Sequence, residues 1–153
     1  MRTNEAGIAI IKKWESFMAK PYLCPAGVPT IGYGSTFYPN GTKVTMKDKA
    51  ITKEEAHQLL VNALVKTFEP EVDKAVVNEI NDNQFSALVS FTYNMGIGNL
   101  KESTLLKKVN AGDYLGASKE FKRWNKARVK GVLQVLAGLT SRRKDEAELF
   151  VRI

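Results

Sequence analysis

The sequence predicts an α+β protein that is mostly helical and carries one small β-hairpin in its first third. Apolar residues recur at helical spacing in residues 5–18 and in several segments after residue 52. Between them, an Asn40-Gly41 pair separates two short stretches of strand-forming residues, which is a strong hairpin signal. These patterns indicate a small lobe with a hairpin and a larger helical lobe.

The first helix is predicted over residues 5–18, because its large apolar residues fall on one face: Ile10, Ile11, Trp14, Phe17 and Met18. Glu15 lies at the edge of that apolar arc. A carboxylate partly surrounded by apolar side chains holds its proton more tightly, as a general acid requires. Helical periodicity alone favours the interpretation that Glu15 is an ordinary exposed residue. The segment that follows it in the chain favours a catalytic carboxylate instead.

The hairpin is predicted to follow directly. Pro21 should end the first helix, and Pro25 with Gly27 should form a turn. Residues 28–37 then favour a strand, and residues 42–45 favour its partner. This arrangement would set the residues of the turn and first strand opposite the end of the helix, across a cleft.

The rest of the chain is predicted to be helical. A capping box at Thr52 opens a helix that runs to about Phe68, and a second box at Asn81 opens a helix that ends at Gly96. Shorter helices are expected near residues 103–110, 113–126 and 141–151. The acidic stretch 69–73 is expected to link the lobes. We therefore predict a single domain over residues 1–153, with a small lobe at about 15–68 and a helical lobe at about 69–153 plus the N-terminal helix.

Composition excludes several functional classes. A chain of 153 residues with 44% hydrophobic and 25% charged residues is typical of a soluble globular domain. It has no apolar run long enough to span a membrane, and its N-terminal apolar run lacks a signal-peptide cleavage site. One Cys and one His cannot form a disulfide or a zinc site of the usual ligand count, so no metal or cofactor is expected. Gly32-Tyr33-Gly34 lacks the spacing of a phosphate-binding loop.

The stretch from Glu15 to Gly34, with Cys24 and Thr30 inside it, resembles the catalytic segment of the phage-type lysozymes, glycoside hydrolase family 24. The resemblance continues in order through the helical half and so covers about residues 5–150; its further segments are Gln84–Gly98, Ser103–Leu106, Asn110–Tyr114, Trp124–Asn125 and Gly138–Glu146. It implies a lysozyme-like fold and hydrolysis of the β-1,4 bond between N-acetylmuramic acid and N-acetylglucosamine in peptidoglycan.

The resemblance also implies roles for individual residues. Glu15 matches the general acid, and Thr30 matches a residue that helps to hold the attacking water. Cys24 stands where many members have Asp, so it could act as a base, as a nucleophile or only as a spacer. A thiol with an ordinary pKa of about 8.5 is mostly neutral at pH 7. The candidate glycan contacts in the helical half are Tyr93, Asn94 and Arg142.

The formal net charge of +7 indicates an anionic partner. Basic residues gather in residues 119–153, which suits association with a cell wall, and contact with an anionic membrane or outer envelope is compatible with it. No helix-turn-helix, zinc or RNP motif supports nucleic-acid binding. A monomer is expected.

The sequence therefore predicts an endolysin that gathers in the host cytoplasm and reaches the wall through a holin-type membrane pore. Two alternatives remain open. One is a non-catalytic cationic protein that binds the wall or a membrane, which should not need Glu15. The other is a lytic transglycosylase, which would cleave the same bond without water and leave an anhydro sugar.

Overall fold

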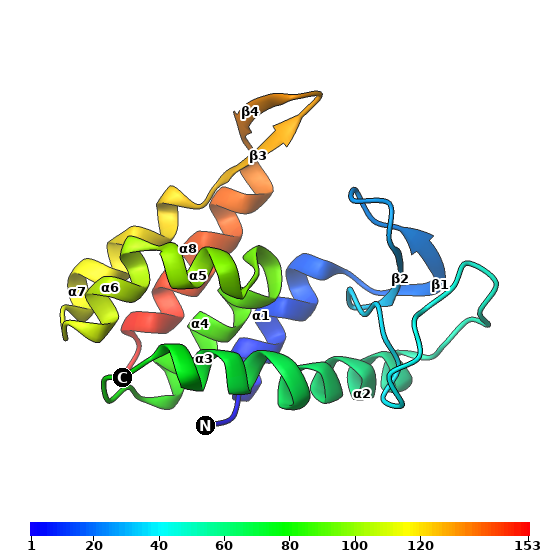
Figure 1. The fold of residues 1–153 in the computed structure, drawn as a ribbon, viewed down its shortest axis with the longest axis horizontal. Coiled ribbons are helices and arrows are strands. Elements are labelled where there is room, and N and C mark those ends of the chain that lie inside the picture. The colour runs from blue at the N-terminus through cyan, green and yellow to red at the C-terminus, as the bar shows by residue number, and fades with distance from the viewer. The chain divides into compact units, whose positions relative to one another are not determined.

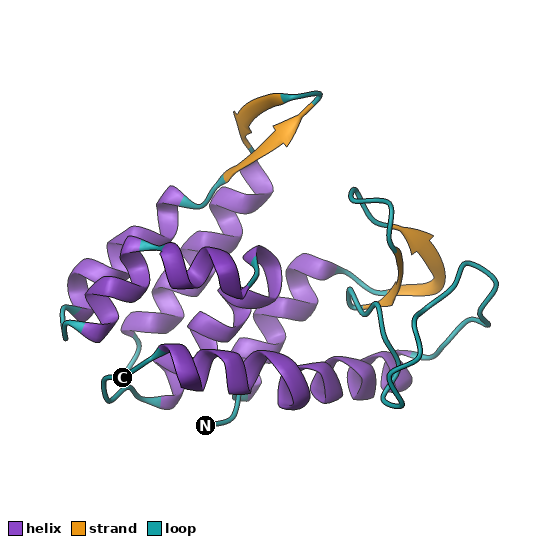
Figure 2. Cartoon of the chain, viewed as in Figure 1, coloured by secondary structure: helices purple, strands orange, loops and turns teal.

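The computed structural model describes residues 1–153 and confirms a mostly helical α+β fold with small antiparallel sheets (Figures 1 and 2). No helix is both long enough and apolar enough to cross a membrane. In chain order the elements are α1 (Glu5–Glu15), β1 (Met18–Leu23), β2 (Pro29–Gly32), α2 (Lys53–Ala63), the π-helix η1 (Leu64–Phe68), α3 (Glu69–Ala75), α4 (Asp82–Met95), α5 (Ile97–Glu102), α6 (Thr104–Asn110), α7 (Tyr114–Glu120), the 3-10 helix η2 (Phe121–Arg123), β3 (Lys126–Val129), β4 (Val132–Val135) and α8 (Ala137–Val151).

The chain forms two compact units. One contains residues 11–67, and the other contains residues 1–10 together with 68–153. The divisions fall inside α1 and inside η1. Each unit has its own group of buried apolar side chains, as expected for segments that bury apolar surface within themselves.

The first helix is shorter than predicted. It ends at Glu15 because Ser16 adopts a left-handed backbone conformation with φ 61°. Met18, which fits the helical spacing of apolar residues, instead begins β1, and Pro21 lies within that strand. Glu15 is therefore the last helical residue, and the chain turns directly from it into the first hairpin.

The first hairpin forms one turn earlier than predicted. β1 pairs antiparallel with β2, whereas the expected second strand at residues 42–45 contributes only an isolated bridge between Phe37 and Lys43. β2 stops at Gly32, which has φ +68°. A Cβ at this position would lie 3.1 Å from the Cβ of Ala56 on α2, so the close packing of helix and strand requires glycine there.

The remaining part of this unit follows the predicted capping box. The Thr52 hydroxyl accepts a hydrogen bond from the Glu55 backbone N–H at 3.1 Å, and the Glu55 carboxylate accepts one from the Thr52 N–H at 3.1 Å. The helix that starts here packs against β2. The hydrophobic cluster beneath the hairpin consists of Ile31, Val44, Leu59, Tyr38 and Ile51.

The helical unit is built around α4. Its predicted capping box is present, with the Asn81 side chain accepting from the Gln84 N–H at 2.8 Å, and the helix ends at Gly96 with φ 88°. Residues 85–92 are buried all round the helix, as expected for a central helix. The first turns of α1 approach it closely, because a Cβ on Gly7 would lie 2.7 Å from the Cβ of Ser86.

The acidic stretch 69–73, which was expected to link the lobes, forms most of α3, and the division between the two units falls just before it, between residues 67 and 68. Glu69 is buried and accepts hydrogen bonds from the Thr3 N–H at 2.9 Å and the Thr3 hydroxyl at 2.7 Å. It also forms an ion pair with Arg2 at 3.1 Å. These partners compensate the burial of its charge, so Glu69 anchors the N-terminal segment to α3.

A second hairpin replaces the end of the helix predicted over residues 113–126. The helical part ends with η2, and β3 and β4 then pair around a two-residue turn. Lys130 and Gly131 in this turn both have positive φ, 51° and 81°, which is the geometry that suits a tight hairpin. Lys-Gly is a weaker turn signal than Asn-Gly, so the sequence pattern did not reveal it. The last helix, α8, accordingly begins at Ala137, four residues before the predicted start.

A buried ion cluster joins α4 to α8. The Glu146 carboxylate is fully buried; it accepts a hydrogen bond from the Ser90 hydroxyl at 2.5 Å and lies 2.7 Å from Arg143 Nε and 3.3 Å from Arg142 Nε. Burial raises the pKa of the Glu146 carboxyl, whereas the guanidinium groups of Arg143 and Arg142 oppose that rise. One carboxylate is thus shared by two buried cations.

We expect Glu146→Ala to lower the free energy of unfolding by about 3–5 kcal/mol, because it leaves two buried guanidinium groups without their carboxylate. Denaturant unfolding followed by circular dichroism measures this change. Glu148→Ala, an exposed change on the same helix, is the matched control and should stay within about 0.5 kcal/mol of the wild type. Equal losses in both variants would contradict a structural role for the cluster.

Candidate active site

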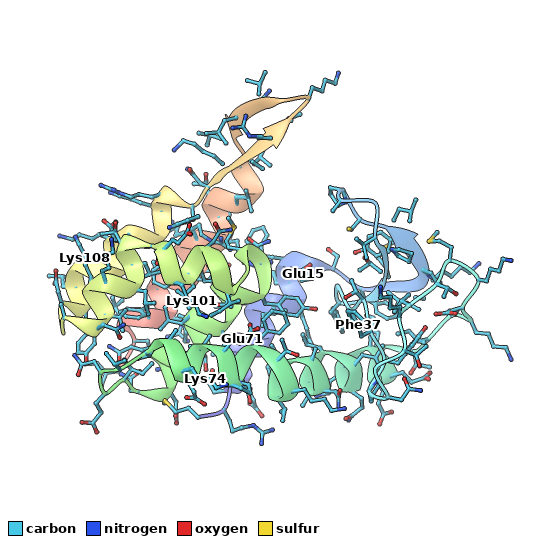
Figure 3. The ribbon with its side chains drawn as sticks, viewed as in Figure 1. Glu15, Phe37, Glu71, Lys74, Lys101 and Lys108 are labelled. Carbon is cyan, nitrogen blue, oxygen red and sulfur yellow. The ribbon has the colours of Figure 1, made fainter.

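The three predicted catalytic residues all lie in the unit of residues 11–67. Glu15 closes α1, as Figure 3 shows, and is half-buried. Cys24 follows directly after β1, and Thr30 lies in β2. The end of one helix, the turn of one hairpin and the second strand of that hairpin therefore supply the three side chains.

A tight turn joins Cys24 to Thr30. The Cys24 N–H donates to the Val28 carbonyl at 3.1 Å, and the Gly27 N–H donates to the Cys24 carbonyl at 2.8 Å. The Thr30 hydroxyl donates to the Val28 carbonyl at 2.9 Å. Gly27 has φ 79°, so the predicted turn residue supplies the left-handed conformation that closes the loop.

This turn also sets the chemistry of the thiol. Hydrogen bonding to the backbone of Val28 lowers the pKa of Cys24 below its ordinary value. Desolvation is the next largest contribution and opposes this shift, and hydrogen bonds with Ala26, Thr30 and Gly27 lower the pKa further. Hydrogen bonds to a charged form favour that form. The thiolate of Cys24 is therefore more populated near neutral pH than that of an ordinary cysteine.

Tyr22 belongs to the same group and was missed by sequence reasoning. It lies opposite Thr30 across the β1–β2 pairing. Burial raises the pKa of the Tyr22 phenol, and the nearby charges of Glu15 and Cys24 raise it further. Tyr22 thus remains a protonated hydrogen-bond donor beside both groups. The sequence offered one signal for Tyr22. It lies two residues before Cys24, and residues two apart in an extended segment point to the same face.

Aromatic side chains surround the end of α1. The rings of Phe17 and Tyr33 lie 5.8 Å apart, and Lys12 Nζ lies 5.3 Å from the centre of the Tyr33 ring. Lys13 Nζ lies 4.8 Å from the centre of the Trp14 ring. Rings at these separations attract cations, so the two lysines near the end of this helix each lie beside an aromatic ring.

The three candidate glycan contacts lie in the other unit. Tyr93 is half-buried with its ring 5.0 Å from that of Phe68, and the exposed Asn94 accepts a hydrogen bond from Arg143 Nη2 at 2.8 Å. Arg142 is only 3% exposed; it donates to the Ser90 carbonyl at 3.1 Å and pairs with Glu146. The buried Arg142 side chain therefore supports the packing of α8 on α4. Tyr93 and Asn94 are the candidate glycan contacts that remain accessible to solvent.

No group of three or more His, Cys, Asp or Glu side chains is arranged to hold a metal ion. The group of Glu15, Tyr22, Cys24 and Thr30 instead offers a carboxyl group, a phenol, a thiol and a hydroxyl. Such a set can donate a proton, accept a proton and position a water molecule.

The chain is similar to phage proteins along nearly its whole length. It is 40% identical over 152 residues to an endolysin of Acyrthosiphon pisum secondary endosymbiont phage 1, with 98% of each chain covered. It is 39% identical over 151 residues to an endolysin of Bacillus phage B103. This match covers 54% of the length of the phage B103 protein.

Solved structures give the same relationship. The endolysin from Escherichia coli O157:H7 phage FAHEc1 superposes with a TM-score of 0.89 at 39% identity, with 99% of this chain and 94% of that chain covered. The muramidase domain of SpmX from Asticaccaulis excentricus superposes with a TM-score of 0.85 at 34% identity and covers 99% of each chain.

The profile of the phage lysozyme family matches residues 12–146. This range contains the helix end, the turn and the strand that carry Glu15, Cys24 and Thr30, as well as the buried cluster around Glu146. With this match and the full-length relatives together, the chain belongs to the phage lysozyme family.

Proposed function

We propose that the protein is a phage endolysin, a muramidase that hydrolyses the β-1,4 bond between N-acetylmuramic acid and N-acetylglucosamine in bacterial peptidoglycan. Membership in the phage lysozyme family supports a glycosidase. The observation that carries the residue assignment is the grouping of Glu15 with the Cys24–Thr30 turn around Tyr22.

In this proposal Glu15 is the general acid. It gives its proton to the oxygen of the glycosidic bond, so that the leaving sugar departs as an alcohol. Its place at the end of a helix fixes the backbone of the acid. The phenol of Tyr22 lies near the charges of Glu15 and Cys24 and stays protonated, so it can serve as a hydrogen-bond donor there.

Thr30 and Cys24 act on the attacking water. The Thr30 hydroxyl orients the water, and the thiolate of Cys24 accepts a proton from it as its oxygen bonds to the sugar carbon. The thiol proton then returns through solvent to the Glu15 carboxylate, which balances the cycle. The lowered pKa of Cys24 supports this role, because it increases the fraction of the basic form.

We also propose a single catalytic domain that acts as a monomer, with Tyr93 and Asn94 as glycan contacts. Arg143 holds the Asn94 side chain and so orders it before substrate binds. The positive net charge draws the protein to the anionic wall. The proposed route is accumulation in the host cytoplasm and release through a holin-type pore.

Glu15→Gln should reduce wall lysis by at least about a hundredfold, because removal of a general acid costs about that much. Turbidity clearing of purified walls measures the rate. Glu5→Gln, an exposed change in the first turn of the same helix, is the matched control and should keep its activity. Near-normal clearing by Glu15→Gln, with folding intact, would exclude this residue as the acid.

For Cys24, we expect Cys24→Ser to lose most activity and Cys24→Asp to retain it, because a hydroxyl is a much weaker base than a thiolate or a carboxylate. Alkylation of the single thiol should inactivate the enzyme. The alkylation rate should rise with pH, and its midpoint should lie below about 8.5, the pKa of an ordinary cysteine. Thr30→Val should move this midpoint upward, because it removes a hydrogen bond to the thiolate. Full activity in Cys24→Ser would make the thiol a spacer.

The digestion products should distinguish hydrolysis from transglycosylation. Addition of water leaves each muropeptide about 18 Da heavier than the corresponding anhydro product, so mass spectrometry of digested peptidoglycan should contain reducing ends. Digestion in heavy-oxygen water should label these ends. A spectrum dominated by unlabelled anhydro sugars would contradict the water-activating roles of Thr30 and Cys24 and would favour the transglycosylase.

A further inference from the structure

The hairpin of β3 and β4 has no role in the proposed catalysis. Its two strands pair from Lys126 with Val135 to Val129 with Val132, and the Leu136 N–H donates to the Asn125 carbonyl at 2.9 Å to close its base. Figure 1 shows the hairpin standing away from the helices of its unit, joined to them only at this base. A two-stranded ribbon of this kind has little stability by itself.

The hairpin carries aliphatic side chains that are largely exposed to solvent. Val132, Leu133 and Val135 are 59%, 56% and 60% exposed, and Val129 at the tip is 36% exposed. All four lie within one ribbon of ten residues. Exposed aliphatic residues scattered singly are ordinary, but a cluster at the end of a projecting element marks a contact surface.

Cationic side chains accompany this cluster. Lys126, Arg128 and Lys130 are exposed, and the register places Lys126 opposite Val135 and Arg128 opposite Leu133. Two of the cations lie on β3 and the third lies in the turn, whereas three of the four aliphatic residues lie on β4. Arg128 Nη1 donates to the Gly131 carbonyl at 3.3 Å, which keeps the guanidinium group beside the turn. No acidic residue occurs between Glu120 and Asp145.

We propose that this hairpin docks on an anionic phospholipid bilayer. The aliphatic side chains of the tip enter the boundary between headgroups and acyl chains, while the lysine and arginine groups contact lipid phosphates. Long basic side chains can place their apolar stems beside the aliphatic groups and keep their charge at the surface. Combined apolar burial and attraction to anionic lipid is the general basis of interfacial binding.

The chemistry of the hairpin favours lipid over a wall glycan. Residues 126–135 contain no aromatic side chain on which a sugar ring could stack, and Gln134 is their only uncharged polar side chain. Positive charge alone would allow the hairpin to bind either an anionic bilayer or an anionic cell wall. The exposed aliphatic groups gain free energy only where they leave water, and a hydrated glycan strand offers no apolar region for them.

This proposal does not rest on the glycosidase activity, because docking uses neither Glu15 nor the turn that contains Cys24. Binding to vesicles without peptidoglycan therefore tests the hairpin alone. Glu15→Gln should bind such vesicles as the wild type does, even though it is expected to fail in wall lysis. Failure of one proposal can thus be recognised while the other stands.

The test measures co-sedimentation of the full chain with vesicles of phosphatidylglycerol and phosphatidylcholine, and with vesicles of phosphatidylcholine alone. The wild type should bind the anionic vesicles and bind the neutral ones at least about tenfold more weakly. Arg128→Gln with Lys130→Gln should weaken anionic binding by about tenfold or more, since each cation near such a surface contributes about 1 kcal/mol. Lys101→Gln with Lys107→Gln, exposed on α5 and α6, should change binding less.

The aliphatic half of the proposal has its own pair of variants. The double variant Val132→Ser with Leu133→Ser should bind anionic vesicles more weakly. It should also lose the vesicle binding that the wild type keeps at high salt, because salt screens charge but not apolar burial. Val77→Ser with Leu115→Ser, exposed aliphatic positions elsewhere in the same unit, should bind as the wild type does. All hairpin variants should retain the wild-type thermal midpoint and cleavage of a short soluble glycan.

Three results would overturn the proposal. The first is wild-type vesicle binding by the Val132 and Leu133 variant, which would leave no role for the aliphatic tip. The second is equal binding of the wild type to neutral and anionic vesicles. The third is a result in which both hairpin variants, the cationic and the aliphatic one, bind vesicles as the wild type does but no longer bind purified lipid-free walls. That result would make the hairpin a wall-binding element.

Discussion

The helical half of the molecule depends on one buried carboxylate. Glu146 on α8 lies between two arginine side chains and the Ser90 hydroxyl of α4. Burying three charged groups is unfavourable unless each has its partner, so the cluster tolerates only one register between these two helices. That register also sets the position of Arg143 Nη2 beside Asn94 and, through the Trp124 carbonyl, the start of the β3–β4 hairpin. A proposed glycan contact and a proposed membrane contact are therefore oriented by the same ion cluster.

The other unit organises its reactive groups mainly through backbone geometry. The left-handed residue Ser16 ends the helix at Glu15, and Gly27 closes the turn that brings Cys24 to Thr30. Hydrogen bonding within this turn lowers the pKa of the Cys24 thiol, which moves a cysteine toward the charged state that an aspartate has at neutral pH. The backbone of the turn thus provides a physical reason why a thiol can occupy a position at which the family resemblance leads us to expect a carboxylate.

Sequence patterns predicted the features that local chemistry controls. Both capping boxes, at Thr52 and Asn81, form as expected, because side chain and backbone partners lie three residues apart. The shorter helices beginning at Ser103 and Asp113 start at those caps. The residues proposed for catalysis came from a motif resemblance, and local turn chemistry explains why Cys24 and Thr30 meet. Tyr22 was missed, because its proximity to Thr30 depends on strand pairing that the sequence pattern placed elsewhere.

The sequence by itself determined the helical class, the helix caps and the net charge, since each depends on composition or on neighbours a few positions away. Only the tertiary structure decided which strands pair, that Arg142 is buried, and that the cations and aliphatic groups of residues 126–135 share one projecting hairpin. The physical reason is that strand register and charge burial are settled by partners distant in the chain. Gly32 against Ala56 and Glu146 against Ser90 are such partners, and no local pattern contains them.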